Sequence, residues 1–456
     1  MAKRLRASGV WLCTVFCLAA AVTFALVSRA TAAQGGNPRG SPNPPPVKER
    51  ALSDRFPGKP SRAPAYSIPV GPLGFGAPGP IYLGERIALV SLDFMGENRL
   101  LFTFRIPALL RRDAGSSEER RIRAVELALP SGAVEAETAW TVHDYARYLW
   151  MLHDGDFLLR NGDNLFEGGA SLALKPSLLF PGPLLWLELD PSQQFMVTFS
   201  REPLAEAHKA GGAVHSSPAS ASAGTAGPDS GPPPEYVLRI LHRNPSQVIL
   251  VSQLRMATQL PISSTGYVEN LRGKDTEWAL NFNSFTGGSR IIGNVQSTCM
   301  PEDKFVSTRE LLVTACSAAG GDRLTAMTTD GRILWVYLTP GTQVWPQLVM
   351  APDGLRIARE TLVTDYPVNA SAPLGPGDLR GQLVRVFDAA TGDVDLETPA
   401  RPALDGGGNV AISPSGRRVA VLNGGAIQVF NLPAPPPLPQ PLPPPPADAA
   451  GGRAKR

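Results

Sequence analysis

Short runs of alternating hydrophobic and polar residues occupy most of the chain, and residues typical of tight turns separate them. The clearest stretch is 409–433, in which Asn409–Ser413, Arg418–Asn423 and Ala426–Leu432 are separated by Pro-Ser-Gly and Asn-Gly-Gly. Alternation with a period of two is typical of half-buried antiparallel strands, and proline, asparagine and glycine supply the backbone angles of tight turns. The stretch therefore predicts three short strands joined by two turns.

The same arrangement recurs upstream and divides the chain into seven blocks of roughly 45 residues, each with up to four strands. The blocks begin near residues 86, 145, 184, 257, 304, 347 and 409. Repeats of this length, built from four short strands, are typical of β-propellers. We therefore predict an all-β fold, a seven-bladed β-propeller of four-stranded antiparallel blades, with disordered Pro-rich tails.

The last block indicates how the ring closes, because it has only three strands before the proline-rich tail. Proline cannot donate a hydrogen bond to a strand ladder, so the tail cannot supply a fourth strand. An open ring would leave two exposed strand edges, which promote aggregation. We therefore expect a segment within Tyr66–Gly84 to form the missing outer strand beside Ala426–Leu432.

Three turn sequences carry a resemblance to known repeats: Ala-Pro-Asp-Gly at 351–354, Ser-Pro-Ser-Gly at 413–416 and Asp-Ala-Ala-Thr-Gly at 388–392. They resemble the turns of WD40-like and YVTN-type bacterial propeller repeats. The resemblance is specific over Gln347–Leu432 and weaker from Arg86 to Leu338, and the Trp-Asp and Gly-His dipeptides of eukaryotic WD40 repeats are absent. It implies the propeller fold and an exported bacterial protein, and it implies no particular activity.

The amino terminus predicts export. Residues 1–33 combine a basic start (Lys3, Arg4 and Arg6), the apolar run Val10–Val27 and small residues before Gln34, as in a signal peptide. The alternative is an uncleaved membrane anchor, because an apolar run of 18 residues approaches the length of a span. Both place the body outside the cytoplasmic membrane, in the periplasm or secreted, and cleavage would leave no membrane span.

Composition sets the remaining boundaries. Residues 34–65 and 434–456 are rich in proline and are expected to be a disordered spacer and a disordered tail. The propeller is expected at 66–433, interrupted by a disordered Ala/Gly/Ser/Pro-rich insertion at 201–234. The net charge of +3 and the lack of a basic stripe argue against a nucleic-acid surface. For the oligomeric state, we expect the protein to be a monomer.

Two cysteines remain after signal cleavage, Cys299 and Cys316. An even pair in an exported protein favours a disulfide, and two buried free thiols are the alternative. A zinc site is disfavoured because no histidine lies in that stretch.

Candidate chemistry is sparse. The densest cluster of His and Asp is His143-Asp144 with His153, Asp154 and Asp156, which suggests a metal site or a base at the ring entrance. Turn formation explains these residues better, because their spacing matches no ligand pattern and Asp-Gly is typical of hairpin turns.

Three further features have structural explanations. Asn161-Gly162-Asp163-Asn164 lacks the spaced carboxylates of a calcium loop, and Gly406-Gly407-Gly408 precedes no helix that would hold a phosphate. Six tryptophans in the predicted body invite comparison with quinone-dependent propellers, but packing between blades explains them. We assign no catalytic, cofactor-binding or metal-ligating residue and expect no cofactor.

These observations favour a non-catalytic binding or scaffold module in the bacterial envelope, with a protein, peptide or glycan as its partner. The alternative is a propeller enzyme with its site on the central axis, such as a quinoprotein-like dehydrogenase or a metal-dependent hydrolase or lactonase. Side chains that converge at the channel mouth distinguish the two: several carboxylate, amide or histidine groups favour the enzyme.

Overall fold

The computed structural model describes residues 47, 49–79, 89–106, 120–142, 147–202, 236–244, 246–254, 259–318, 320–368 and 374–434. The chain divides into two compact units, 1–46 and 47–456, and all described residues belong to the second. The predicted signal peptide, residues 203–234 of the predicted insertion and residues 435–456 of the predicted tail lie outside the described residues. Within the described part of the chain, no helix has the length and apolarity of a membrane span.

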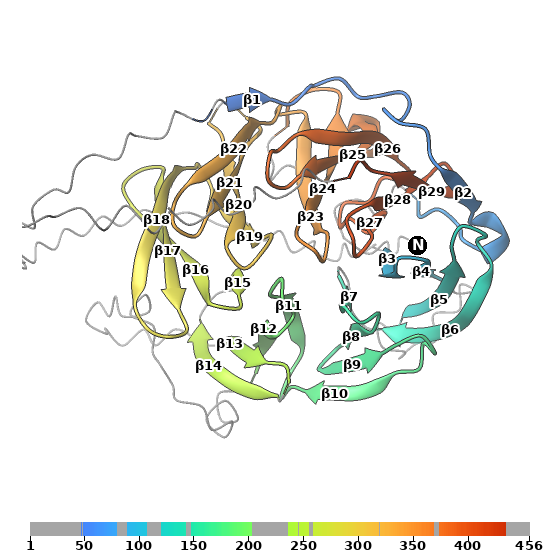
Figure 1. The fold of residues 1–456 in the computed structure, drawn as a ribbon, viewed down its shortest axis with the longest axis horizontal. Coiled ribbons are helices and arrows are strands. Elements are labelled where there is room, and N and C mark those ends of the chain that lie inside the picture. The colour runs from blue at the N-terminus through green and yellow to red at the C-terminus, as the bar shows by residue number, and fades with distance from the viewer. Residues whose placement is uncertain are drawn as a thin grey trace, which may run out of the picture. The chain divides into compact units, whose positions relative to one another are not determined.

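Seven sheets surround a central axis, as predicted, and the protein is a seven-bladed β-propeller (Figure 1). Blade 1 consists of β3 (Val90–Gly96), β4 (Arg99–Arg105), β5 (Arg120–Ala128) and β6 (Val134–Val142). Blade 2 consists of β7 (Leu149–Met151), β8 (Phe157–Asn161), β9 (Asn164–Gly168) and β10 (Lys175–Leu179). Blade 3 consists of β11 (Leu184–Leu189), β12 (Phe195–Arg201), β13 (Tyr236–His242) and β14 (Gln247–Leu254). In each of these three blades, the strand that comes first in the sequence lies nearest the axis.

The next three blades follow the same order. Blade 4 consists of β15 (Ile262–Ser263), β16 (Gly266–Arg272), β17 (Glu277–Ser284) and β18 (Ser289–Gln296). Blade 5 consists of β19 (Glu302–Phe305), β20 (Glu310–Cys316), β21 (Asp322–Thr328) and β22 (Ile333–Leu338). Blade 6 consists of β23 (Gln343–Met350), β24 (Arg356–Thr364), β25 (Leu379–Asp388) and β26 (Val394–Ala400). Blade 7 consists of β27 (Val410–Ile412), β28 (Arg418–Asn423), β29 (Ala426–Asn431) and β2 (Tyr66–Pro69).

The predicted closure of the ring is confirmed. Strand β2 pairs antiparallel with β29, with Tyr66 opposite Val429 and Pro69 opposite Ala426. The backbone N–H of Val70 extends the pairing by donating to Gly425 O at 3.0 Å. A strand that precedes blade 1 in the sequence thus completes blade 7 as its fourth strand.

Residues 49–65 differ from the expectation of a disordered spacer. This segment, called here the N-terminal strap, begins with β1 (Glu49–Ala51), which pairs in parallel with β22 as a fifth strand of blade 5. It then runs along the outside of the ring to β2 (Figure 1). The Pro/Gly-rich composition did not reveal this order, because the backbone hydrogen bonds of the strap are formed with the backbone of the blades. For example, Ser61 N donates to Glu397 O at 2.8 Å.

The strap also covers two buried arginines of blade 6. Arg385 Nη2 donates to Ser53 O at 2.7 Å, and Gln343 Nε2 donates to the same oxygen at 2.9 Å. Gln343 Oε1 accepts from Arg385 at 2.5 Å and from Arg359 at 3.4 Å. Burial lowers the pKa of Arg359 to about 10, although Asp322 lies 3.1 Å away. The strap carbonyl therefore satisfies part of a costly buried charge.

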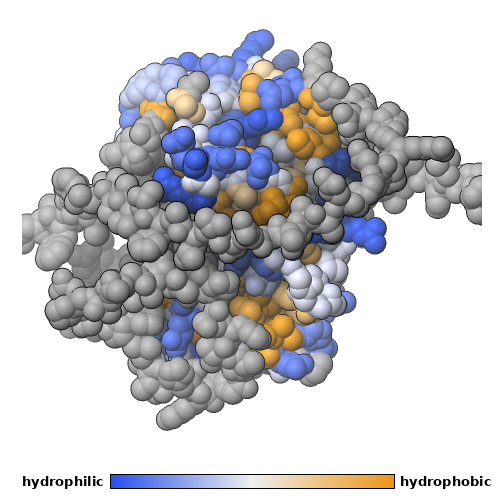
Figure 2. Space-filling model, turned by 90° about the vertical axis from the view of Figure 1, so that its left-hand side faces the viewer, coloured by the Kyte–Doolittle hydropathy of each residue, from blue (hydrophilic) through white to orange (hydrophobic). Residues whose placement is uncertain are grey.

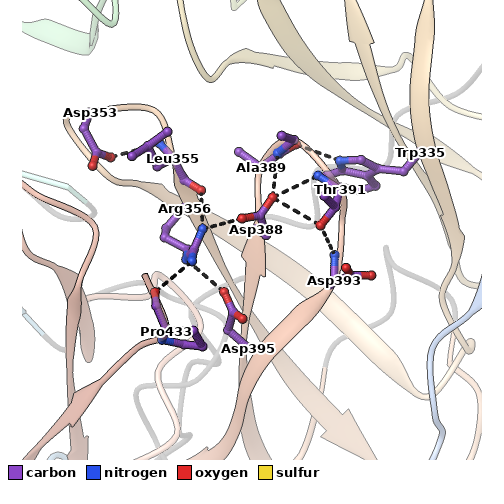
Figure 3. Close-up of polar contacts among 11 residues, drawn as sticks. Trp335, Asp353, Leu355, Arg356, Asp388, Ala389, Thr391, Asp393, Asp395 and Pro433 are labelled. Carbon is purple, nitrogen blue, oxygen red and sulfur yellow. Dashed lines mark hydrogen bonds and ion pairs between the residues drawn. The ribbon is translucent and has the colours of Figure 1, made fainter. Parts of the chain in front are cut away.

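Another buried arginine explains the Asp-x-x-Thr-Gly turn at 388–392 (Figure 3). Arg356 is 1% exposed; its Nη1 donates to Asp388 at 2.6 Å, and its Nε lies 2.8 Å from Asp395. The other oxygen of Asp388 accepts the backbone N–H of Thr391 at 2.9 Å. Trp335 Nε1 of blade 5 donates to Ala389 O at 2.8 Å. The turn thus ties blades 5 and 6 together, and its role is structural.

Glu360 is a buried carboxyl between blades 6 and 7. It is fully buried on β24 and accepts from Gln382 Nε2 at 3.1 Å. Burial raises its pKa from 4.5 to about 8, and hydrogen bonds from the backbone of Gly408 and Val410 oppose that rise. The folded state therefore favours the protonated acid at neutral pH.

The first prediction concerns the strap. Removal of residues 34–60 should lower the free energy of unfolding by roughly 3 kcal/mol, because Arg385 and Gln343 lose a buried acceptor. The thermal midpoint of the truncated protein measures the effect. A chain that lacks only residues 34–46 is the control and should melt like the wild type. Equal midpoints for both truncations would show that the strap contributes nothing.

The second prediction concerns Glu360. The unfolded carboxyl ionises near 4.5 and the folded one near 8, so this group makes the wild type lose stability as pH rises between these values. Glu360→Gln removes that loss. The stability of the variant relative to the wild type should therefore increase from pH 5 to pH 9, as measured by denaturant unfolding. A pH-independent difference would contradict the raised pKa. Asp303, whose pKa burial raises to about 7, is present in both proteins and cancels.

Candidate functional site

A groove lies between blades 4 and 5 and has a volume of about 830 Å³. Four turns line it: 264–265 between β15 and β16, 284–290 between β17 and β18, 308–310 between β19 and β20, and 328–332 between β21 and β22. In an antiparallel blade, the first and third turns lie at the same end of the strands. The four turns therefore gather on one rim of the ring. This feature is called here the blade 4–5 groove.

Three exposed arginines give the groove its chemistry: Arg290, Arg309 and Arg332. Arg290 is held in place, because its Nη2 donates to Thr329 O at 3.0 Å and its guanidinium lies 5.5 Å from the centre of the Phe282 ring. Arg309 and Arg332 form no ion pair with any residue that the structure describes. Their guanidinium groups are therefore available to a ligand.

The two carboxylates in the groove are already engaged. Asp330 accepts a hydrogen bond from the Thr328 hydroxyl, which is the largest cause of its lowered pKa, and the charge of Arg332 contributes to the same shift, so Asp330 stays ionised at neutral pH. Glu310 accepts from the Ser307 hydroxyl at 3.5 Å. With three arginines and two carboxylates, the groove carries a formal charge of +3 − 2 = +1.

The turn 328–332 is tightly fixed against both neighbouring elements. Gly331 has a φ of +92°, and its N–H donates to Thr328 O at 2.9 Å. A Cβ at this position would lie 2.6 Å from Ile292 O, on β18 of blade 4. On the other side, Thr329 N donates to Arg309 O at 2.8 Å. The groove therefore has a preformed wall, since glycine lets the blade 5 turn approach the blade 4 backbone.

The rim around the groove mixes polar and apolar residues. Figure 2 views the ring from the side that lies at the left in Figure 1, and hydrophilic residues there alternate with hydrophobic patches. Ile291 and Ile333, which follow Arg290 and Arg332 in the sequence, are 53% and 40% exposed. Neither isoleucine lines the groove, and a mixed surface is as common on proteins in general as at their contact sites.

A second group of charged residues belongs to the inner strands. Asp93 is on β3, Arg147 lies two residues before the start of β7, Glu188 is on β11 and Lys304 is on β19. Desolvation within the ring is the largest cause of each pKa shift: it raises the pKa of the two carboxyls and lowers that of the two cations. Arg147 acts on both carboxyls, and Lys304 acts on Glu188. The opposite charges therefore offset only part of the desolvation of Asp93, Glu188 and Lys304, whereas Arg147 is exposed at the surface.

The strongest candidates from the sequence do not gather at either place. His143 and Asp144 lie outside the described residues. His153 N donates to Gln193 Oε1 at 2.7 Å, and the pKa of His153 is lowered, mainly by desolvation. Asp154 Oδ1 accepts the N–H of Asp156 at 3.3 Å. The Asp154 carboxylate thus takes part in a turn, and His153 contributes its backbone N–H.

The other candidates also have structural partners. Asn161 Nδ2 donates to Thr141 O at 3.0 Å, and Gly408 packs against the backbone of Val90. Trp140 and Trp278 each donate to a backbone carbonyl at 3.1 Å. Among the described residues, no group of three or more His, Cys, Asp or Glu is arranged to hold a metal ion.

Cys299 and Cys316 form a disulfide, as the sequence analysis expected, with a Cα–Cα distance of 5.6 Å. The bond joins the segment that enters blade 5 to the end of β20. It therefore fastens the inner strands of the blade whose turns form one side of the groove.

The arginines of the groove were not identified from the sequence. Each lies beside a tight turn: Arg290 follows Gly287-Gly288, Arg309 lies between two strands, and Arg332 follows Asp330-Gly331. That pattern places an arginine on three turns of two consecutive blocks. It does not reveal that these turns converge, because the distance between them depends on how two blades pack.

No protein-family model and no curated protein matches the chain. Solved structures resemble its fold. A chain of the mitotic checkpoint complex is 11% identical, with 84% of this chain and 100% of that chain covered and a TM-score of 0.44. The acylaminoacyl peptidase of Pyrococcus horikoshii is 10% identical, with 74% and 49% covered and a TM-score of 0.43. The hydrazine synthase of Kuenenia stuttgartiensis is 12% identical, with 76% and 97% covered and a TM-score of 0.40.

At these identities and TM-scores, the likeness carries no argument about function. The present chain spans about half the length of the peptidase chain, 49% of it.

The third prediction tests the wall of the groove. Gly331→Ala should lower the free energy of unfolding by roughly 3 kcal/mol, because it adds a positive-φ strain and an overlap with Ile292 O. Gly288→Ala is the matched control: its φ is +85°, but the space around it is open, so only about 1 kcal/mol should be lost. Chemical denaturation of both variants measures the difference. Equal losses would show that the two blades do not approach closely at Gly331.

Proposed function

We propose that this protein is a non-catalytic binding module of the bacterial envelope that holds a macromolecular partner in the blade 4–5 groove. The observation that carries the proposal is the pair of exposed guanidiniums, Arg309 and Arg332, which form no ion pair within the described residues and stand on a rigid rim. Arginine donors in a preformed arrangement bind a partner with little loss of conformational freedom.

The envelope location is supported by two features of the chain. Residues 1–33 have the composition of a signal peptide, and Cys299 is bonded to Cys316. Disulfides persist mainly in oxidising compartments outside the cytoplasm. The resemblance of the turns at 351–354 and 413–416 to YVTN-type bacterial repeats supports a bacterial exported protein.

The second candidate function is a propeller enzyme, and the charged group on the inner strands is the observation that favours it. Asp93 and Glu188 are carboxyls with raised pKa values, which is a common property of acid–base groups. The charges of Arg147 and Lys304 act on these carboxyls, which favours a structural role. Binding through the groove is therefore the better supported function.

The fourth prediction tests the binding function. Immobilised protein without residues 1–33 should retain a protein or glycan from an envelope extract. Replacement of Arg290, Arg309 and Arg332 by alanine should abolish that retention, because it removes the cationic groups of the groove. The control variant replaces three other exposed arginines, Arg121, Arg401 and Arg417, and thus has the same net charge. It should retain the partner.

Two results would contradict the proposal. One is equal retention by the groove variant and the control variant, as measured by quantitative mass spectrometry and glycan analysis. The other is a stoichiometric metal or quinone in the purified protein together with a turnover that Asp93→Asn or Glu188→Gln abolishes while the thermal midpoint is unchanged. The second result would favour the enzyme.

A further inference from the structure

We propose that the blade 4–5 groove recognises an acidic peptide segment of its partner, and that Arg309 and Arg332 bind the carboxylates of that segment. This inference rests on the proposed binding function and adds the chemistry of the partner.

The charge of the groove selects an anion. Arg290 is engaged with Thr329 O, while Asp330 and Glu310 accept from hydroxyls of neighbouring residues. Arg309 and Arg332 remain as exposed cations without an ion pair among the described residues. The guanidinium group presents planar paired donors that match a carboxylate, so two acidic side chains would compensate both cations.

The turns fix the positions from which these arginines extend. Arg332 N donates to Thr328 Oγ1 at 3.1 Å, and Arg309 O accepts from Thr329 N at 2.8 Å. The two arginine backbones are thus joined through one turn, and Gly331 holds that turn against β18. The backbone positions from which the two cations extend are therefore fixed, which favours an ordered series of charges over a diffuse negative surface.

The lining favours a peptide over a small free anion. Besides the arginines, hydroxyl side chains line the groove: Ser264, Thr265, Ser284, Ser289, Thr308 and Thr329. Hydroxyls both donate and accept, so they can satisfy the N–H and C=O groups of an extended backbone. A volume of about 830 Å³, bounded by turns from two blades, exceeds what one oxyanion needs. Recognition of acidic segments by arginine clusters is an established mode of peptide binding.

The fifth prediction uses defined probes, a fluorescein-labelled peptide with alternating Glu and Ser and the same peptide with Gln in place of Glu. Fluorescence anisotropy should show saturable binding of the Glu peptide to the wild type and binding at least about tenfold weaker for the Gln peptide. Arg309→Ala/Arg332→Ala should weaken binding of the Glu peptide by about tenfold or more. Arg121→Ala/Arg417→Ala, with the same change in charge, should bind like the wild type.

Two further arms separate the sources of the anion. Arg309→Lys/Arg332→Lys keeps the charge but loses the paired donors, so its affinity should lie between those of the wild type and the alanine variant. Inorganic phosphate should compete only weakly. If phosphate displaces the peptide at an equimolar concentration, the groove binds small free oxyanions and the inference is wrong.

The comparison of Glu and Gln peptides on the wild type needs no variant, so it stays decisive even if a variant unfolds. Equal binding of both peptides, or of neither, overturns the inference. The envelope retention experiment is independent of this result: a partner retained through the groove together with no preference for the Glu peptide would preserve the binding function and reject the acidic peptide.

Discussion

The packing of blade 7 against blade 1 is the interaction on which the structure depends. Each blade buries both faces against its neighbours, so a ring needs the first and last blades to meet. Leu92 and Phe102 of blade 1 share one hydrophobic cluster with Leu422 and Val429 of blade 7, and Ile68 of β2 belongs to the same cluster. Strand β2, which comes from the amino-terminal part of the chain, completes blade 7. Without this contact, both blades would expose a hydrophobic face and a strand edge.

Most of this fold could be predicted from the sequence, because local rules govern it. Alternation and turn residues located the blocks, and the missing fourth strand of the last block indicated closure by a segment after Tyr66. The N-terminal strap could not be predicted, since its three-residue strand β1 obtains its hydrogen bonds from β22. The buried arginines were equally hidden: all nine residues of β24 are buried, including Arg356 and Arg359, where a charged side chain suggests an exposed face.

The candidate site was less accessible to sequence reasoning than the fold. Histidines and aspartates drew attention because they are chemically versatile, but Asp154 and Asp388 bond mainly to the backbone of their own turns. The arginines of the groove come from turns of two blocks, and only the packing of blade 5 on blade 4 brings these turns together. Gly331 makes that packing possible, and a glycine in an Asp-Gly turn has an ordinary local explanation that conceals its contact with β18.

The central axis and the groove both carry charged residues, and desolvation distinguishes them. On the axis, Asp93, Glu188 and Lys304 are partly buried, and desolvation is the largest cause of their pKa shifts. In the groove, Asp330 and Glu310 accept hydrogen bonds from the hydroxyls of Thr328 and Ser307, and the charge of Arg332 also acts on Asp330. The guanidiniums of Arg309 and Arg332 are exposed, so an acidic ligand exchanges water for paired hydrogen bonds with little desolvation cost. An external anion therefore binds at a lower desolvation cost at the rim than on the axis.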